Sequence, residues 1–441
     1  MNEITGPKGR FISGNFRDIH KDMFAFFDKC IAEHGDIFKF RAFHVKCYVV
    51  NRPEYIEELL VKNHTRVRKP WDLRQLRILL GKGLLTNEGQ PWLKQRRASQ
   101  PSFQKKRIAE YAKIMAKHIE KHVDTWEDGE ELDIHQKMMD VALYIAGETL
   151  FGTIVDDIEN IERLLDLAMN QFGKMISGGV PLPLWFPTPL NLRMIWMTYK
   201  FDFAIMDMIR ERKKNPQQAN DLLSDLINIK YEDGSPISDK QVRDEIITLI
   251  AAGHETTAIS LSWTLYLLAQ HPEVKEKLFA EVDEVLAGRL PRASDMQNLT
   301  YTVKVMKESM RFYPPAWGLG REVTEDIEIA GQKIAKNSQV FVLMYFLHRD
   351  PRFYENPHEF YPERWTPEFE KQLHRYAYLP FGGGPRLCIG NHFAMMETTL
   401  LLAHMMQKCD FELVKDHAVV MHPSVTLRPK NGIRMIVHKR K

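Results

Sequence analysis

The sequence predicts a single domain that is mainly α-helical with a smaller β region. Long stretches with the apolar spacing of amphipathic helices fill the middle of the 441-residue chain. Short apolar segments bounded by turn residues lie toward both ends. No Gly/Ser-rich linker and no internal repeat divides the sequence, so we expect one domain over residues 1–441.

Local patterns predict the individual elements. Apolar runs between turn residues predict strands at 37–40, 47–50, 327–329, 334–335 and 433–437, which places the sheet-rich parts near 37–50, 327–335 and 433–437. Helical periodicity predicts helices at 107–126, 132–151, 158–175, 193–213 and 239–270. The longest uninterrupted apolar run, 340–347, has eight residues and is typical of a buried strand or core segment.

The longest predicted helix, 239–270, lies between Pro236 and Pro272, and Ser238 or Asp239 can cap its start. It is apolar on nearly all sides, which predicts a helix through the protein interior. Its middle reads AGHETT, where small residues allow close approach and a threonine can bond the carbonyl four residues back. Because a buried unpaired carboxylate is costly, we interpret Glu255 and Thr256 as a catalytic proton relay. A solvent-facing Glu–Thr pair is the structural alternative.

Composition and charge narrow the class of protein. Lys plus Arg total 61 against 58 for Asp plus Glu, so the net charge of +3 indicates no nucleic-acid partner. Four widely spaced cysteines argue against a disulfide framework or a zinc site and favour a reducing cytoplasm. The first residues lack the features of a signal peptide, and eight apolar residues fall far short of the roughly 20 that span a bilayer. We therefore expect a soluble, cytoplasmic protein without a transmembrane segment.

The segment FGGGPRLCIG, 381–390, contains the cysteine best suited to ligate a metal. Cys388 lies between a glycine-rich loop and an apolar run with helical spacing. A thiolate at a helix N-terminus is stabilised by backbone N–H groups and the helix dipole. Bound axially to heme iron, such a thiolate favours O–O cleavage.

Two further pairs have helical spacing. Glu308 and Arg311 lie one turn apart, and Arg364 in a proline-rich stretch could pair bidentately with Glu308 to form structural scaffolding. Trp92 and Arg96 lie four residues apart and could hold a heme propionate. Taken alone, the first pair is more typical of an exposed helix and the second of an ordinary amphipathic helix.

Together these residues resemble the cytochrome P-450 family of heme-thiolate monooxygenases, over essentially the whole chain. The family's pattern Phe-x-x-Gly-x-Arg-x-Cys-x-Gly is matched at Phe381, Gly384, Arg386, Cys388 and Gly390. The Trp92/Arg96, Glu255/Thr256 and Glu308/Arg311 pairs and Arg364 follow in the family's order. The resemblance implies a single P-450 domain with heme b between the long central helix and the cysteine loop.

The resemblance also assigns roles to individual residues. Cys388 is then the iron ligand, in the loop that Phe381 and Gly390 complete, and Glu255 and Thr256 deliver protons. Ala252 and Gly253 line the oxygen groove. The implied propionate ligands are Trp92, Arg96, Arg321 and Arg386.

The implied activity is insertion of one atom of O2 into a C–H or C=C bond of a hydrophobic small molecule such as a terpenoid, steroid or fatty acid. In the expected absence of a membrane anchor, the chain resembles the soluble bacterial-type members of the family. The resemblance implies a monomer that receives electrons from a ferredoxin or flavodoxin with an NAD(P)H-dependent reductase. The Glu255/Thr256 pair argues against the family members that use hydrogen peroxide in place of O2. No feature of the sequence indicates the members that rearrange substrates without external electrons. A heme-binding sensor or carrier is the alternative from another class, and a helical protein without cofactor is a more distant one.

Family placement further implies a mainly apolar pocket and a docking surface for the electron carrier. Arg74 and Arg77 could bind a substrate carboxylate, although exposed helix charges explain them equally simply. The expected pocket residues are Trp71, Leu76, Leu79, Ala316, Trp317 and Val425. The expected docking cations are Lys94, Arg97, Lys105, Lys106 and Arg107, for which a solvated charged face is the alternative.

Overall fold

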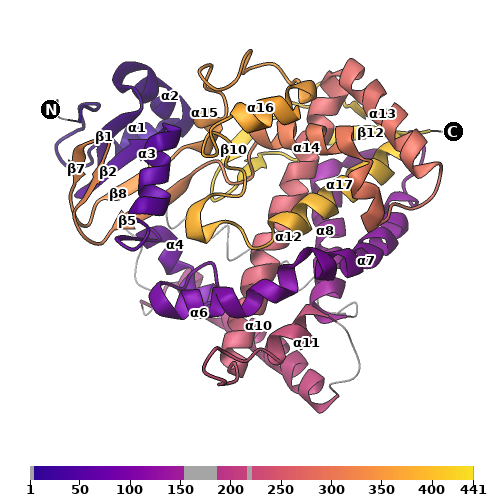
Figure 1. The fold of residues 1–441 in the computed structure, drawn as a ribbon, viewed down its shortest axis with the longest axis horizontal. Helices are drawn as coiled ribbons and strands as arrows, with labels where there is room; N and C mark the ends of the chain where they lie inside the picture. The colour runs from indigo at the N-terminus through magenta and orange to yellow at the C-terminus, as the bar shows by residue number, and fades with distance from the viewer. Residues whose placement is uncertain (1–3, 153–185, 216–220, 441) are drawn as a thin grey trace. The chain divides into compact units, whose positions relative to one another are not determined.

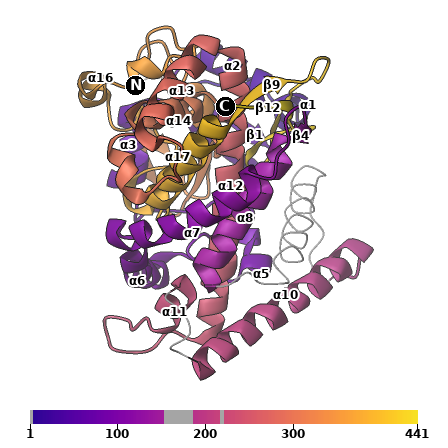
Figure 2. The same ribbon diagram turned by 90° about the vertical axis from the view of Figure 1, so that its right-hand side faces the viewer.

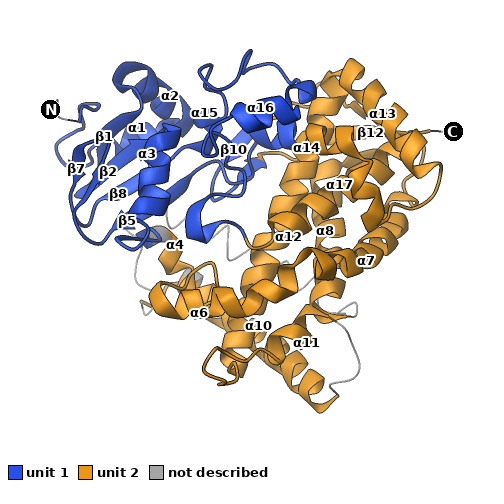
Figure 3. Ribbon diagram, viewed as in Figure 1, with its two compact units in different colours: residues 1–71, 307–388, 421–428 blue, residues 72–306, 389–420, 429–441 orange. Residues whose placement is uncertain are grey.

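The computed structural model describes residues 4–152, 186–215 and 221–440, drawn as a ribbon in Figure 1. The chain divides into two compact units, each assembled from three separated segments (Figure 3). Unit 1 comprises residues 1–71, 307–388 and 421–428, and unit 2 comprises residues 72–306, 389–420 and 429–441. The single domain expected over 1–441 stays a prediction.

A five-stranded sheet with the strand order β1-β2-β8-β5-β3 is the centre of unit 1. β2 and β8 run parallel, with Tyr48 opposite Val340, and the other neighbours run antiparallel. Figure 1 shows the indigo N-terminal strands beside the orange strands from the second half of the chain. Branched side chains such as Val50 and Val342 are fully buried, as expected for residues that pack well on a pleated surface. The strands are β1 (Ile37–Ala42), β2 (Val45–Val50), β3 (Val67–Arg68), β5 (Leu319–Val323) and β8 (Gln339–Val342).

Short helices and two small antiparallel sheets complete unit 1. The small sheets are β6 (Ile327–Ile329) with β7 (Gln332–Ile334), and β10 (Met421–Pro423) with β11 (Leu427–Pro429). The helices are α1 (Phe16–Lys21), α2 (Met23–His34), α3 (Pro53–Glu57), η1 (Glu58–Lys62), α15 (Met344–Leu347), η4 (Pro362–Arg364), α16 (Pro367–Gln372) and η5 (Gly384–Arg386). Helices α4 (Trp71–Gln75) and α14 (Thr300–Phe312) each include a position at which the two units divide.

Unit 2 is built around α12 (Asp239–Gln270), which packs along α8 and also contacts α10, α13 and α17 (Figure 2). The Oγ of Ser238 accepts a hydrogen bond from the N–H of Gln241 at 3.2 Å, so Ser238 is the cap of α12. A three-stranded sheet has the order β4-β12-β9. The other helices are α5 (Arg77–Leu80), α6 (Gly89–Ser99), η2 (Gln100–Phe103), α7 (Lys105–Val123), α8 (Ile134–Phe151), α10 (Pro189–Lys214), α11 (Leu222–Ile227), α13 (Pro272–Leu286), η3 (Ala293–Gln297) and α17 (Asn391–Lys408). The strands are β4 (Glu131–Asp133), β9 (Cys409–Leu413) and β12 (Arg434–Lys439).

The predicted fold class, a helical majority with a smaller strand region, is confirmed. Helix 239–270 has the predicted bounds, and the strands near 37–50 and 327–335 are present. The helix expected at 132–151 begins only at Ile134, because residues 131–133 pair with β12. The run 340–347 divides into the end of β8 and the short helix α15. The helix expected at 158–175 lies outside the described residues.

Candidate active site

The loop that carries Cys388 is held by its own backbone. The N–H of Cys388 donates to the carbonyl of Phe381 at 3.0 Å, and the N–H of Leu387 donates to that of Gly384 at 3.1 Å. These bonds close the loop and leave the Cys388 side chain exposed. Along the chain, α17 begins three residues later, at Asn391. The sequence therefore places the thiol just ahead of a helix N-terminus.

The other cysteines differ from Cys388 in their surroundings. Cys30, Cys47 and Cys409 are buried. Burial raises the pKa of Cys30 and Cys409 to about 11, so both remain protonated at neutral pH. Because only the thiolate ligates a metal, the exposed Cys388 is the better candidate.

Two loop glycines are required by close packing within unit 1. Gly384 has φ +65°, and a Cβ there would collide with the carbonyl oxygen of Leu60 in η1. At Gly383 a Cβ would lie 2.8 Å from the ring of Tyr376. The glycine run thus lets η5 and the cysteine loop pack closely against η1 and Tyr376.

The segment before the loop is fixed by three side chains whose contribution the sequence did not reveal. The hydroxyl of Tyr354 donates to the carbonyl of Ala377 at 3.1 Å, and that of Tyr378 donates to the carbonyl of Lys307 at 2.8 Å. The N–H of Leu379 donates to Nε2 of the buried His348 at 2.9 Å. Burial lowers the pKa of His348 to about 3, so its ring is neutral and Nε2 is an acceptor at pH 7.

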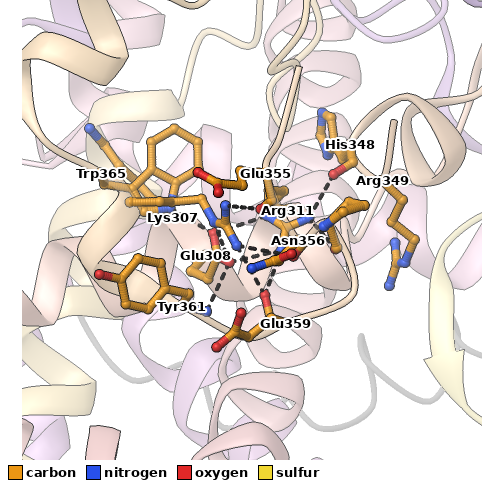
Figure 4. Close-up of polar contacts among 12 residues, drawn as sticks. Lys307, Glu308, Arg311, His348, Arg349, Glu355, Asn356, Glu359, Tyr361 and Trp365 are labelled. Atoms are coloured by element: carbon orange, nitrogen blue, oxygen red, sulfur yellow. Dashed lines mark hydrogen bonds and ion pairs between the residues drawn. The ribbon is translucent and has the colours of Figure 1, made fainter. Parts of the chain in front are cut away.

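The structure brings Glu308, Arg311 and Arg364 together in one buried network (Figure 4). Arg311 donates to both carboxylate oxygens of Glu308, at 2.8 and 3.0 Å, and Arg364 donates to Oε1 at 2.9 Å. The indole N–H of Trp365 donates to Oε2 at 2.9 Å, a contact that the sequence did not predict. The Arg311 guanidinium also binds the carbonyls of His348, Pro357 and Glu359. Figure 4 shows these groups converging on Glu308, so α14 is tied to the irregular stretch 348–365.

Two other residues assigned to the cofactor also lie in unit 1. Arg321 is on β5, and its guanidinium donates to the carbonyl of Gly320 at 2.7 Å. Arg386 ends η5, two residues before Cys388. Both side chains are half-buried.

In unit 2, one face of the middle of α12 is less buried than the rest of the helix. Leu249, Ala252, Gly253 and Thr256 are spaced along one side of the helix and are exposed or half-buried, whereas most of their neighbours are buried. The Thr256 hydroxyl donates to the carbonyl of Ala252 at 2.8 Å. A Cβ on Gly253 would meet open space. Glu255, the other half of the predicted relay, is buried.

A second carboxyl group, not predicted from the sequence, lies behind this face. Glu397 of α17 is fully enclosed and accepts a hydrogen bond from the Thr257 hydroxyl at 3.1 Å. Its desolvation raises its pKa to about 8. Glu397 is therefore largely protonated at neutral pH.

Trp92 and Arg96 lie on α6, four residues apart as predicted. Trp92 is buried and Arg96 is half-buried. Between them, the Gln95 amide donates to the carbonyl of Lys82, and its oxygen accepts from Asn87. These bonds join α6 to the loop that follows α5.

The expected pocket residues have varied surroundings. Leu76 and Leu79 belong to a hydrophobic core cluster of unit 2, and Ala316 packs against one in unit 1. Trp71 and Val425 are exposed. Arg77 donates to the carbonyl of Thr86 at 2.9 Å, and Arg74 is half-buried in α4.

The structure defines the orientation of the Trp317 side chain within unit 1, which the sequence alone does not give. Its indole N–H donates to the carbonyl of Ser424 at 2.9 Å. Its ring packs edge-on against Phe24 at 5.4 Å between centroids. The contact joins the segment after α14 to the β10–β11 turn.

Comparison with known proteins identifies the family. The family model described as Cytochrome P450 matches residues 4–437. The chain belongs to the cytochrome P450 family. It is 34% identical over 374 residues to cyclooctatin synthase from Streptomyces melanosporofaciens, covering 84% of this chain and 82% of the relative. It is 30% identical over 418 residues to pentalenene oxygenase from Streptomyces avermitilis, covering 94% of this chain and 91% of the relative. The crystal structure of the cytochrome P450DA heme domain matches with a TM-score of 0.90 and 26% identity, covering 100% of this chain and 98% of that chain.

This cytochrome P450 is accordingly an oxidoreductase of the monooxygenase class, with heme as its cofactor. The residues present fit a heme, because the one exposed cysteine thiol, that of Cys388, lies on a loop closed by backbone hydrogen bonds and could ligate the iron. Within the described ranges, no helix is long and apolar enough to cross a membrane.

The cations expected to dock an electron carrier are mostly paired inside the P450 itself. Lys94 and Arg97 bind Asp233 and Glu232 at 2.6 and 3.0 Å. Arg107 binds Asp225 and Glu110 at 3.0 and 2.6 Å, whereas Lys105 and Lys106 are exposed. The net positive charge of these five cations is therefore smaller than the sequence indicates, since three of the five are paired with carboxylates nearby.

Proposed function

We propose that this P450 inserts one oxygen atom from O2 into a C–H or C=C bond of a hydrophobic small molecule, with a terpenoid as the favoured class. The observation that carries the proposal is the exposed Cys388 thiol on a closed loop that matches the family's cysteine motif. One relative, pentalenene oxygenase, is named for the oxygenation of pentalenene, which supports the substrate class. Steroids and fatty acids are the competing classes.

Cys388 would ligate the iron of heme b, and Trp92, Arg96, Arg321 and Arg386 would bind its propionates. Phe381 and Gly390 would complete the cysteine loop, and Ala252 and Gly253 would leave room for oxygen. Bound through a thiolate, heme supplies O2 binding and O–O cleavage.

We assign the proton relay to Glu255 and Thr256. The Thr256 hydroxyl uses its proton on the carbonyl of Ala252, which leaves its oxygen lone pairs able to accept from water. The exposed side of Ala252 and the open space at Gly253 leave room for that water beside Thr256. Glu255 would supply the proton to that water, which the Thr256 oxygen holds in place.

We place the enzyme in the cytoplasm as a monomer. Electrons would come from a ferredoxin or flavodoxin reduced by an NAD(P)H-dependent reductase. The exposed Lys105 and Lys106 are the cations best able to attract an acidic carrier.

The substrate class can be tested by titrating the heme-loaded enzyme with terpenoids, steroids and fatty acids while recording the heme spin-state spectrum. The proposal expects terpenoids to give the tightest spin-state change and a product heavier by one oxygen atom when electrons are supplied. Tighter binding and turnover of a fatty acid would contradict the terpenoid assignment. Heme binding with no turnover by any electron donor would favour the sensor or carrier alternative.

A further inference from the structure

Gln95 is a buried amide on the same face of α6 as the two residues assigned to the heme propionates. Trp92 lies one turn before it and Arg96 directly follows it. Both ends of its side chain are used, since Nε2 donates to the carbonyl of Lys82 at 2.9 Å and Oε1 accepts from the Asn87 amide at 2.8 Å. A buried amide is costly unless these bonds are made. Gln95 therefore favours one placement of α6 against the loop that follows α5.

The carbonyl of Lys82 also accepts a second amide, which comes from α12. Nε2 of Gln241 donates to this oxygen at 2.9 Å, and a carbonyl oxygen has lone pairs for both bonds. The same Nε2 donates to Oε1 of Glu245, one turn further along α12, at 3.0 Å. A continuous chain of hydrogen bonds thus runs from Gln95 on α6 through one backbone oxygen to Glu245 on α12.

Two buried carboxyl groups near the start of α12 also hold the backbone of this loop. Oδ2 of Asp244 accepts from the N–H of Lys82 at 2.7 Å, and Oε2 of Glu245 accepts from the N–H of Leu84 at 3.0 Å. Between them, a Cβ on Gly83 would lie 2.5 Å from the carbonyl oxygen of Asp244. The loop therefore lies directly against α12 at three consecutive positions.

We propose that Gln95 and Glu245 are positioning residues, which hold the propionate-binding side chains of α6 at a fixed place relative to α12. The inference rests on the assignment of Trp92 and Arg96 to the heme propionates under the proposed function. The hydrogen bonds of Gln95 and Glu245 go to the loop and to α12, so these residues act on heme through Trp92 and Arg96. Without the bonds α6 can shift, and both propionate ligands shift with it.

A purely stabilising role is the alternative. A satisfied network of buried hydrogen bonds could fasten the loop to α12 without any effect on heme. The two roles differ in a measurable way. Positioning predicts loss of heme from a protein that is still folded, whereas simple stabilisation predicts only a lower unfolding temperature.

The test is the rate at which the purified heme-loaded enzyme releases heme to excess apomyoglobin, at a temperature where circular dichroism shows every variant folded. Gln95→Met keeps the side-chain volume but removes both hydrogen bonds, so it should raise the release rate about fivefold or more. Glu245→Gln places an NH2 group against one of its two donors and should raise the rate about threefold or more. The double variant should release heme at most about twice as fast as Gln95→Met, because both residues act through the same loop.

Three further variants serve as controls. Gln90→Met changes an exposed glutamine in the first turn of α6 and should leave the release rate unchanged. Asp295→Asn weakens the ion pair of the buried Asp295 with Arg289, so it should lower the unfolding temperature without changing heme release. Arg96→Met tests the underlying propionate assignment and should raise the release rate at least as much as Gln95→Met.

The outcomes separate this inference from the assignment on which it rests. An unchanged rate in Gln95→Met beside faster release in Arg96→Met would overturn the positioning role and leave the propionate assignment standing. Unchanged rates in both would contradict the propionate assignment and the positioning role together. Equally fast release in Asp295→Asn and Gln95→Met would attribute heme loss to general destabilisation and would also overturn the proposal.

Discussion

Glu397 of α17 accepts a hydrogen bond from the Thr257 hydroxyl of α12 in a fully enclosed site. The two residues are 140 positions apart in sequence, and Thr257 directly follows the proposed relay threonine. The contact ties the middle of α12 to the helix that follows the cysteine loop along the chain. Desolvation raises the pKa of the Glu397 carboxyl group to about 8.

Glu397→Gln should make stability less dependent on pH. Between about pH 4.5 and 8 the unfolded chain has released the proton that the folded protein retains, so stability falls as pH rises. An amide keeps the shape and the acceptor but cannot ionise, so at pH 8–9 it should raise the free energy of unfolding by roughly 2–4 kcal/mol. Thermal unfolding from pH 5 to pH 9 measures this. The exposed Glu368→Gln is the control, and a parallel pH profile for Glu397→Gln and the native enzyme would contradict the prediction.

Arg364→Ala should strongly destabilise unit 1. It removes a buried donor from Glu308 and leaves that carboxylate partly uncompensated, which typically costs about 3–5 kcal/mol. Denaturant unfolding measures the loss. Arg352 supplies the control, since its ion pairs with Asp36 and Asp350 involve a 49%-exposed side chain and Arg352→Ala should cost about 1 kcal/mol or less. Similar losses for both variants would refute a special role for the buried network.

Thr256→Ala should retain heme but lose coupling between electrons consumed and product formed. The hydroxyl beside Ala252 is the proposed proton relay, so its removal should divert electrons to hydrogen peroxide, with product per electron down about tenfold or more. Product and peroxide yields per NAD(P)H measure the effect. Thr264→Val, which removes a buried hydroxyl bonded to the carbonyl of Ser260, should stay coupled. Full coupling in Thr256→Ala would rule out the relay.

Neutralising the carboxylates that mask Lys94 and Arg97 should accelerate the first electron transfer. Glu232→Gln with Asp233→Asn unmasks two cations, whereas Lys105→Gln with Lys106→Gln removes two. With an acidic carrier at low salt, the first pair should raise the reduction rate and the second should lower it, each about threefold or more, and salt should reduce both effects. Stopped-flow reduction measures the rates, with Lys415→Gln as the control. Equal rates in all variants would exclude docking at this surface.

Elements defined by local signals were predictable from the sequence. The bounds of α12 follow from the Ser238 cap and the flanking prolines, and the Glu308/Arg311 pair needs one helical turn. The pairing of strands that are distant in the sequence was harder to predict. β5 was not predicted, because its partner β8 becomes a neighbour only in the folded sheet.

The candidate site divides in the same way. The motif around Cys388 is contiguous, so its residues could be named from the sequence. The indole of Trp365 on Glu308, the Leu379–His348 bond and the Thr257–Glu397 contact join residues 31 to 140 positions apart. No periodicity or spacing rule specifies such contacts. The masking of Lys94 and Arg97 likewise depends on how the 232–233 turn folds back onto α6.

The most direct test of the central claim is the absorption spectrum of the reduced, carbon-monoxide-bound protein with and without Cys388. The native protein should show the shifted Soret band typical of thiolate-ligated heme. Cys388→Ser should abolish that shift, while Cys30→Ala, which changes a buried cysteine with a raised pKa, should preserve it. Persistence of the shifted band in Cys388→Ser would contradict the assignment of Cys388 as the iron ligand.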